Sequence, residues 1–315
     1  MLTALRIRNG CLEVIIPEEN ATPLNDSIWI NLVNPTEEET AMVEAITQFS
    51  LPDIKETEEL EASSHYAIYD NGFQVNCSFL QRENGRIKNT NVAFLLNNER
   101  LISLSAREIP VFHLLKIRYG NTAGLIKDSI SILISLLEIK IDDLADILEE
   151  AYSGIETISH QVLERSKTEL EGAIDGLAIQ DDLNGQARLC LMDGQRDSNF
   201  LLRRGRLTQD NIKRVNDILG DIETLLSHNT FLSERVDFLL NAAMGFINIE
   251  QNKIIKIFSI AAVVFLPPTL IASIYGMNFH FMPELSKAWG YPLAIVLMIV
   301  SGISPYLYFK RKGWL

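Results

Sequence analysis

Residues 257–275 read IFSIAAVVFLPPTLIASIY, and residues 291–309 read YPLAIVLMIVSGISPYLYF. Each stretch has 19 residues and contains no charged side chain. That length is close to the ~20 residues that an α-helix needs to cross the hydrocarbon core of a bilayer. The two stretches therefore predict a pair of transmembrane helices joined by a short loop, with the remainder of the chain folding in water.

Positive charge flanks the pair of stretches on the outside. Five basic residues lie just beyond their outer ends, whereas the connection between them carries only Glu284 and Lys287. Because an excess of Lys and Arg marks the cytoplasmic side, we expect both termini to be cytoplasmic and the loop to face outward. Residues 1–18 lack the pattern of a secretory signal. The flanking basic residues are Lys253, Lys256, Lys310, Arg311 and Lys312.

The charge of the chain is divided unevenly. Residues 253–315 carry a net charge of about +5, so the chain total of −13 leaves about −18 on residues 1–252. An acidic cytoplasmic part repels nucleic acid and anionic lipid headgroups and attracts cations, so we do not expect a nucleic-acid partner. Most of these charges are also explained by the need for a soluble surface.

The N-terminal third shows a mixed pattern. Short β-branched or aromatic runs separated by turn residues predict strands, and Pro35, Thr36 and the glutamates after them predict a helix through Phe49. We therefore expect a cytoplasmic α/β domain over residues 1–123. The predicted strands cover residues 12–16, 28–32, 73–80, 91–96 and 101–105.

Helical periodicity dominates from residue 124 onward. Apolar residues recur at steps of three and four, which predicts cytoplasmic helices over 124–209. A further pattern runs into the first apolar stretch without a break, so residues 210–277 predict one stalk helix whose membrane span covers about 254–275. Residues 278–290 would form the external loop, 291–309 the second transmembrane helix and 310–315 a basic cytoplasmic tail. The fold class is an α+β/α membrane protein.

Two transmembrane helices cannot enclose an aqueous path by themselves. A hairpin is therefore either a passive anchor or one part of an assembly around a shared axis. One stripe of the first span is mostly small or polar, which fits a pore wall but also fits tight helix packing in lipid. Pro267 and Pro268 interrupt the span and predict a bend. The stripe comprises Asn252, Ile255, Ser259, Ala262, Leu266, Thr269, Ser273 and Gly276.

Three quoted segments carry a specific resemblance. YGMNF at 275–279 is followed by MPEL at 282–285, the tail reads YFKRKGWL at 308–315, and residues 241–252 read NAAMGFINIEQN. Together they resemble the CorA family of magnesium transporters, close to the enterobacterial-type proteins. The resemblance is strongest over 237–315 and continues more weakly to the N-terminus.

The resemblance implies a funnel-shaped homopentamer in a bacterial inner membrane, with the first spans around the pore. Gly276, Met277 and Asn278 would form the selectivity filter, where a ring of neutral amide oxygens accepts hydrogen bonds from the water shell of Mg²⁺. Such a ring binds weakly enough to release the ion. Gly276 would allow the turn that points Asn278 inward. The implied pore-lining residues are Asn252, Ile255, Phe258, Leu266, Thr269 and Ser273, of which Phe258 lies off the stripe.

The resemblance also implies regulation by cytoplasmic Mg²⁺, bound by acidic residues between neighbouring subunits. The matching positions are Glu58, Glu59 and Asp217, and a further position falls on Ser135, with Glu138 one turn away. Each of these could equally be a solvated surface residue. At the outer mouth, His280 stands where the family commonly has glutamate, so Glu284 is the only carboxylate in the external loop and cation capture could depend on histidine protonation.

The function expected from this pattern is Mg²⁺ influx, with Co²⁺ and Ni²⁺ as secondary ions, driven by the membrane potential. Divalent cations, membrane lipid and further copies of the chain are the expected partners. No nucleotide-binding motif occurs, and neither enzymatic activity nor a cofactor other than Mg²⁺ is expected. The scattered cysteines and histidines predict no zinc site or disulfide framework. A zinc transporter of the same superfamily, or a membrane-anchored sensor or scaffold, remains the alternative.

Overall fold

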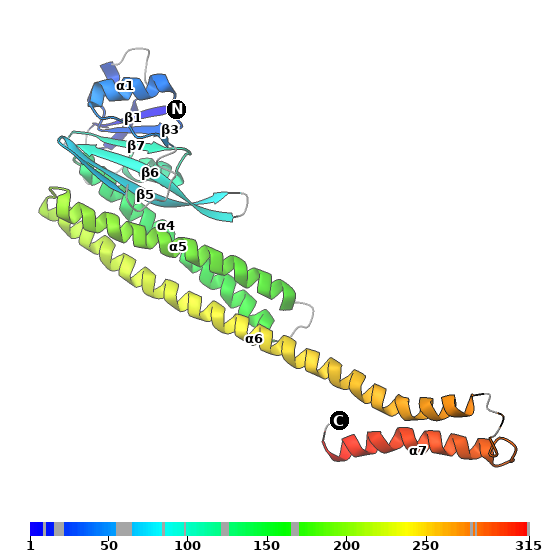
Figure 1. The fold of residues 1–315 in the computed structure, drawn as a ribbon. Helices are drawn as coiled ribbons and strands as arrows, with labels where there is room; N and C mark the ends of the chain where they lie inside the picture. The colour runs from blue at the N-terminus through cyan, green and yellow to red at the C-terminus, as the bar shows by residue number, and fades with distance from the viewer. Residues whose placement is uncertain are drawn as a thin grey trace. The chain divides into compact units, whose positions relative to one another are not determined.

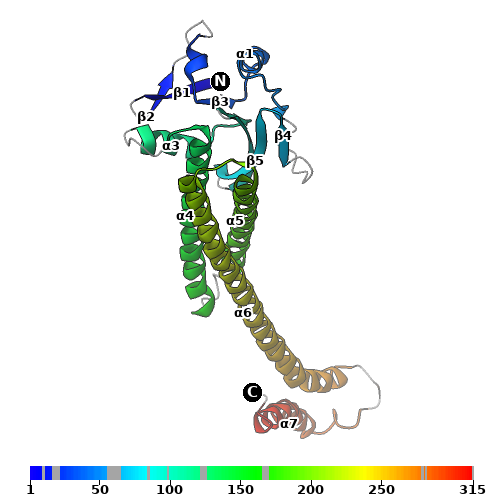
Figure 2. The ribbon, with the colours of Figure 1, turned by 90° about the vertical axis from the view of Figure 1, so that its left-hand side faces the viewer.

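The computed structural model describes residues 1–8, 11–15, 22–54, 65–83, 86–97, 99–120, 126–164, 170–277, 280 and 282–313. The chain divides into two compact units, Met1–Leu240 and Asn241–Leu315. One helix, α6 (Gln209–Tyr275), contributes to both units (Figures 1 and 2).

A seven-stranded sheet forms the centre of the first unit. Its order is β2-β1-β3-β7-β6-β5-β4, and β3 pairs with β7 in parallel while all other neighbours are antiparallel. The strands are β1 (Leu2–Arg8), β2 (Cys11–Ile15), β3 (Trp29–Val33), β4 (Tyr66–Tyr69), β5 (Gly72–Glu83), β6 (Arg86–Asn97) and β7 (Leu101–Ser105). A short 3₁₀ helix, η1 (Thr22–Asp26), precedes β3.

Helices cover both faces of this sheet (Figure 1). Helix α1 (Glu37–Thr47) packs on one face, where Val43 and Phe49 join buried side chains of β3, β6 and β7. A capping box of Thr36 and Glu39 starts α1, because each side chain bonds a backbone N–H that the helix leaves free. On the other face lie α3 (Pro110–Gly120), α4 (Ser129–Leu163) and α5 (Leu170–Arg204). Trp29 there meets Phe112 edge to face, with ring centroids 5.3 Å apart.

The first part of α6 packs on α4 and α5 through paired polar side chains. Asn184 of α5 and Asn229 of α6 are both fully buried. The Asn229 amide donates to the Asn184 backbone oxygen at 2.7 Å and to Asn184 Oδ1 at 2.6 Å, and the Asn184 amide donates back to the Asn229 backbone oxygen at 3.0 Å. This reciprocal pair satisfies two buried amides and fixes the register of the two helices.

The second unit is a helical hairpin. It contains the end of α6 and helix α7 (Gly290–Arg311), joined by a turn-rich loop. Both helices are long and apolar enough to cross a membrane. Pro267 and Pro268 lie inside α6, and the helix continues through both of them.

The sequence pattern anticipates most of these elements. The five predicted strands correspond to β2, β3, β5, β6 and β7, and the helix expected from Pro35 to Phe49 corresponds to α1. Strands β1 and β4 and helix α3 are not anticipated. Helix α3 shows no clear apolar stripe, because it exposes Leu114 and Ile117 while it buries Phe112 and Leu115.

Asn229→Ala should destabilise the first unit by about 2–3 kcal/mol, because it removes three hydrogen bonds, two to Asn184 and one from Arg188, and leaves the Asn184 side-chain oxygen buried without the Asn229 donor. The measurement is the thermal unfolding midpoint of the purified chain, which should fall by several degrees. Ser227→Ala, an exposed position on the same helix, is the matched control and should leave the midpoint unchanged. Equal midpoints for the two variants would contradict the proposed role of the amide pair.

Candidate functional site

In the second unit, one row of α6 side chains is half-buried. This row recurs at the helical period over four turns, as expected for a helix covered along one side. Its members are Ile260, Ala261, Val264, Pro267, Pro268, Ile271 and Tyr275. Helix α7 contributes the matching row, in which Ala294 is buried, whereas Gly290 is buried against the Glu284 backbone of the preceding loop.

Gly302 sets how closely the two helices approach. A Cβ atom at this position would lie 3.3 Å from Pro268 Cγ and 3.5 Å from the Val264 carbonyl oxygen. Small residues at such crossings let helices pack closely in lipid, where dispersion contacts hold them together. The two prolines of α6 therefore face α7, which supports the helix where proline has removed backbone donors.

The predicted pore-lining residues lie on the other side of α6. At about 100° per residue, they centre opposite the row that α7 covers. Ile255, Phe258 and Leu266 are 61%, 71% and 66% exposed. Asn252, Thr269 and Ser273 are exposed as well. Phe258, which the small-residue stripe leaves out, belongs to this uncovered face.

Thr269 shows what this face can offer to a hydrated ion. Its Oγ1 donates to the Phe265 carbonyl oxygen at 2.7 Å, so the hydroxyl proton is used inside the helix. The lone pairs of Oγ1 remain available as acceptors. Water molecules bound to a cation present their hydrogens outward, so an acceptor is the group that this position needs.

Helix α6 ends next to the predicted filter. The Gly276 N–H donates to the Ala272 oxygen at 2.9 Å, and the Met277 N–H donates to the Ile274 oxygen at 3.3 Å, which tightens the last turn. Gly276 does not adopt a left-handed backbone conformation, and its role in pointing Asn278 inward stays a prediction. A Cβ atom there would lie 3.1 Å from the Ala272 oxygen, so limited space, rather than the backbone conformation, favours glycine at this position. Asn278 lies outside the described residues.

The loop after the filter is built from turns. Leu285 and Lys287 donate backbone N–H groups to the oxygens of Met282 and Glu284, at 3.2 and 3.3 Å. The Lys287 ammonium lies 5.3 Å from the ring centre of Trp289. His280 is exposed and Glu284 is half-buried. An aromatic side chain paired with a cation is typical of the membrane interface.

Comparisons with known proteins agree with this geometry. Residues 25–311 match the family described as "CorA-like Mg2+ transporter protein". The chain belongs to the CorA family. It is 44% identical over 317 aligned residues to proteins named magnesium transport protein CorA from Yersinia pseudotuberculosis serotype I (strain IP32953) and Escherichia coli (strain K12), with the full length of each chain covered.

Solved structures with the same fold are more distant in sequence. A structure titled as the complete CorA magnesium transporter from Methanocaldococcus jannaschii matches with a TM-score of 0.78 at 18% identity, covering 100% of this chain and 99% of that one. The full-length CmaX protein matches with a TM-score of 0.71 at 15% identity, covering 100% and 98%. At these identities the likeness shows the fold of the CorA family.

The regulatory positions implied by the CorA resemblance differ in their surroundings. Glu138 of α4 forms a bidentate pair with Arg214 of α6, at 2.7 and 2.6 Å, and Arg214 also donates to Ser135 Oγ at 2.7 Å. Burial opposes the charge of Arg214, but the bonds to Glu138 outweigh it and raise the pKa of the guanidinium. As a metal ligand Glu138 would have to give up this pair.

Asp217, three residues after Arg214, is exposed. Among the described residues, no hydrogen bond or ion pair reaches its carboxylate. Glu58 and Glu59 lie outside the described residues. Asp217 is thus the one predicted regulatory carboxylate in the described part of the chain that is free to bind a cation. Sequence reasoning did not identify Arg214. Its position about one helical turn from the acidic residues Asp210 and Asp217 is nevertheless a pattern that indicates an ion pair.

The spacing of residues along the sequence also does not reveal a polar cluster in the first unit. His65 lies just before β4, while Asp193 and Asp197 stand one turn apart on α5. Burial opposes a charge on His65, but its bonds to the two aspartates outweigh burial and raise its pKa to about 9. The Asp-x-x-x-Asp spacing on an amphipathic helix is a signal, but nothing in the sequence links it to a histidine more than 120 residues away.

Gly302→Leu should disrupt the contact between α6 and α7, because there is no space beyond a Cβ atom at 3.3 Å from Pro268. We expect a lower thermal midpoint of the purified membrane protein, by several degrees, and a smaller fraction of assembled material in size-exclusion chromatography. Ser304→Leu, at an exposed position of α7, is the control and should behave like the unchanged chain. Tolerance of leucine at 302 would rule out close packing at this crossing.

Proposed function

We propose that the chain is one subunit of an oligomeric channel that carries Mg²⁺ across a bacterial inner membrane into the cell. The observation that carries this proposal is the uncovered face of α6, which has polar side chains at both ends and large apolar side chains between them. The full-length likeness to proteins named magnesium transport proteins supports Mg²⁺ as the ion.

An assembly follows from what the uncovered face contains. Lipid could cover Ile255, Phe258 and Leu266, but polar groups such as Asn252 and Ser273 are costly against hydrocarbon and are usually turned toward protein or a water-filled path. Copies of α6 arranged around an axis would place all of these residues on a shared lumen, with α7 outside. We propose five copies, as the CorA resemblance implies, with both termini in the cytoplasm.

At the outer end of this lumen we propose the filter of Gly276, Met277 and Asn278. Mg²⁺ is small and gives up its water reluctantly, so selection of the hydrated ion suits a ring of acceptor groups better than a ring of direct ligands. A ring of Asn278 amide oxygens would accept hydrogen bonds from that water. Glu284 of the external loop and the exposed His280 would meet the ion before the filter.

Deeper in the lumen, the apolar side chains would act as the gate. Rings of Ile255, Phe258 and Leu266 form a constriction that hydrated ions cannot enter when it is dry. Thr269 and Ser273 would lie between the filter and this constriction and offer hydroxyl acceptors. A small outward displacement of the subunits would wet the constriction and open the path.

The driving force we propose is the membrane potential. One elementary charge gains about 2.3 kcal/mol per 100 mV, so a divalent ion gains about twice that on entering a negative-inside cell. No coupling to a nucleotide is then required. Co²⁺ and Ni²⁺ carry hydration shells of similar geometry and would pass as secondary ions.

Asn278→Ala should abolish Mg²⁺ flux, at least tenfold, because the filter loses its acceptor ring. The measurement is Mg²⁺ uptake into proteoliposomes that hold an indicator, under an imposed negative-inside potential and low internal Mg²⁺. Asn248→Ala, an exposed asparagine of α6 outside the apolar span, should retain uptake. Full uptake by Asn278→Ala would refute the filter, and uptake of Zn²⁺ alone by the unchanged chain would favour the zinc-transporting alternative. A chain that carries neither ion would act as an anchor or scaffold.

We propose that cytoplasmic Mg²⁺ closes the channel by binding Asp217, together with Glu58 and Glu59, between subunits. Carboxylates brought together at an interface repel one another, and a bound divalent ion neutralises them. Loss of the ion would then favour separation of the subunits, which is a two-state element that ligand binding biases. Glu138 contributes less to this site, because Arg214 already neutralises it.

Asp217→Asn should weaken inhibition by internal Mg²⁺, so that uptake continues at several-fold higher internal Mg²⁺ than in the unchanged chain. Asp221→Asn is the matched control, since it is also exposed and stands one turn further along α6. The measurement is the dependence of initial uptake on Mg²⁺ loaded into the vesicles. Identical inhibition curves for both variants would remove Asp217 from the regulatory site.

A further inference from the structure

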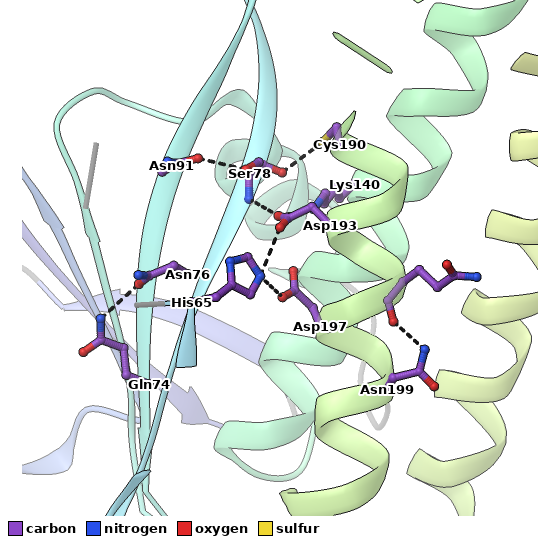
Figure 3. Close-up of polar contacts among 11 residues, drawn as sticks. His65, Gln74, Asn76, Ser78, Asn91, Lys140, Cys190, Asp193, Asp197 and Asn199 are labelled. Carbon is purple, nitrogen blue, oxygen red and sulfur yellow. Dashed lines mark hydrogen bonds and ion pairs between the residues drawn. The ribbon is translucent and has the colours of Figure 1, made fainter. Parts of the chain in front are cut away.

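The polar cluster of His65, Asp193 and Asp197 is built around one ring nitrogen (Figure 3). His65 Nε2 lies 3.0 Å from Asp193 Oδ1 and 3.2 Å from Asp197 Oδ1. The one ligand atom that each residue offers lies within 4.8 Å of the other two. The Asp197 side chain is completely buried and that of Asp193 is 11% exposed, so this is an interior site.

Each carboxylate has a second oxygen, and the two differ. Asp193 Oδ2 accepts a hydrogen bond from the backbone N–H of Ser78 in β5 at 2.7 Å, and this bond fixes the orientation of the carboxylate. Asp197 Oδ2 is buried and accepts no hydrogen bond of normal geometry from the described residues, and the Cys77 thiol that lies near the Asp197 side chain is only a weak donor. A buried carboxylate oxygen without a donor is costly unless a cation or a water molecule meets it. This free oxygen is the observation that points to a missing ligand.

The net charge of the groups around the cluster is compatible with a bound cation. The buried Lys140 ammonium lies 3.8 Å from Asp193 Oδ2, on the oxygen that does not face His65. With a neutral imidazole, two carboxylates and one ammonium give a net charge of −1 in an interior that disfavours unbalanced charge. Either a proton on His65 or a metal ion can offset it. The thiols of Cys77 and Cys190 are also fully buried and interact with Asp193 and Asp197.

We propose that His65, Asp193 and Asp197 form a site for one divalent transition-metal ion of the Co²⁺, Ni²⁺ and Zn²⁺ group. One imidazole and two carboxylates suit these borderline ions, whereas Mg²⁺ prefers oxygen ligands and retained water. Tetrahedral ligands at 2.0–2.1 Å from a metal stand about 3.3 Å apart, close to the two separations that the cluster shows. A water molecule completes the coordination, and Ser78 supplies the outer hydrogen bond that such carboxylates usually have.

The site belongs to the first unit, whereas the apolar part of α6 that carries the proposed ion path belongs to the second. A bound ion would join the chain entering β4 to α5 through three bonds. Ions of this group are also the secondary ions proposed for the channel, so the site would respond to the competing ion rather than to Mg²⁺.

The test is a Co²⁺ titration of the full chain in detergent, stripped of metal and then held in excess Mg²⁺ so that all-oxygen sites are filled. Four- or five-coordinate Co²⁺ absorbs visible light far more strongly than octahedral hydrated Co²⁺. We expect an intense band that saturates at one Co²⁺ per chain. In His65→Gln/Asp197→Asn the band should disappear, or the Co²⁺ affinity should fall at least tenfold.

This double variant keeps the Lys140–Asp193 pair balanced, so it should fold. His113→Gln, an exposed histidine of α3, is the control and should keep the full band. Asp197→Asn alone should also lower the Co²⁺ affinity, because it removes one of the three proposed ligands. An unchanged chain that gives only the weak octahedral spectrum would show that a proton is the sole occupant. A band that persists in the double variant would also overturn the proposal.

Discussion

A hydrocarbon bilayer offers no hydrogen bonds, and this constraint governs how the second unit must be completed. A helical hairpin satisfies its own backbone, but it leaves two long surfaces facing outward. Helix α7 covers one side of α6, where Gly302 admits Pro268 and the Val264 carbonyl. The other side presents Asn252, Thr269 and Ser273. A single chain cannot give these groups an aqueous environment, which is the reason we propose an assembly of several copies.

The first unit solves a different problem, which is to hold long helices in register in water. It does so with a few buried or half-buried polar contacts placed among apolar ones. The Asn184–Asn229 pair locks α5 to α6, and the Glu138–Arg214 pair locks α4 to α6. Apolar packing alone would tolerate sliding by a turn, whereas each of these pairs has one register in which all donors are met.

Much of this organisation follows from sequence, for reasons that differ between elements. The transmembrane hairpin is predictable because charge-free stretches of 19 residues have few other uses. Helix α1 is predictable because Thr36 and Glu39 form a capping box. Strand β1 and helix α3 escape prediction because tertiary packing, rather than local periodicity, decides which of their faces is buried. The stripe on α6 predicts the uncovered face but misses Phe258, since size and polarity do not report which side a partner helix covers. His65 cannot be linked to Asp193 from sequence, because only the fold brings β4 to α5.

The adjacent prolines of α6 have a mechanical consequence. Proline lacks a backbone N–H, so the carbonyl oxygens of Val263 and Val264 lose the donors that would normally come from residues 267 and 268. Two successive rungs of the helix are missing, and the Gly302 side of α7 lies against one of the two carbonyls. Bending stiffness is lowest where such bonds are absent, and the Thr269 hydroxyl, which also bonds to the Phe265 oxygen, favours a bend at the same place. Any flexing of the membrane part of α6 is therefore concentrated in one short hinge, and the helix on either side moves as a stiff lever.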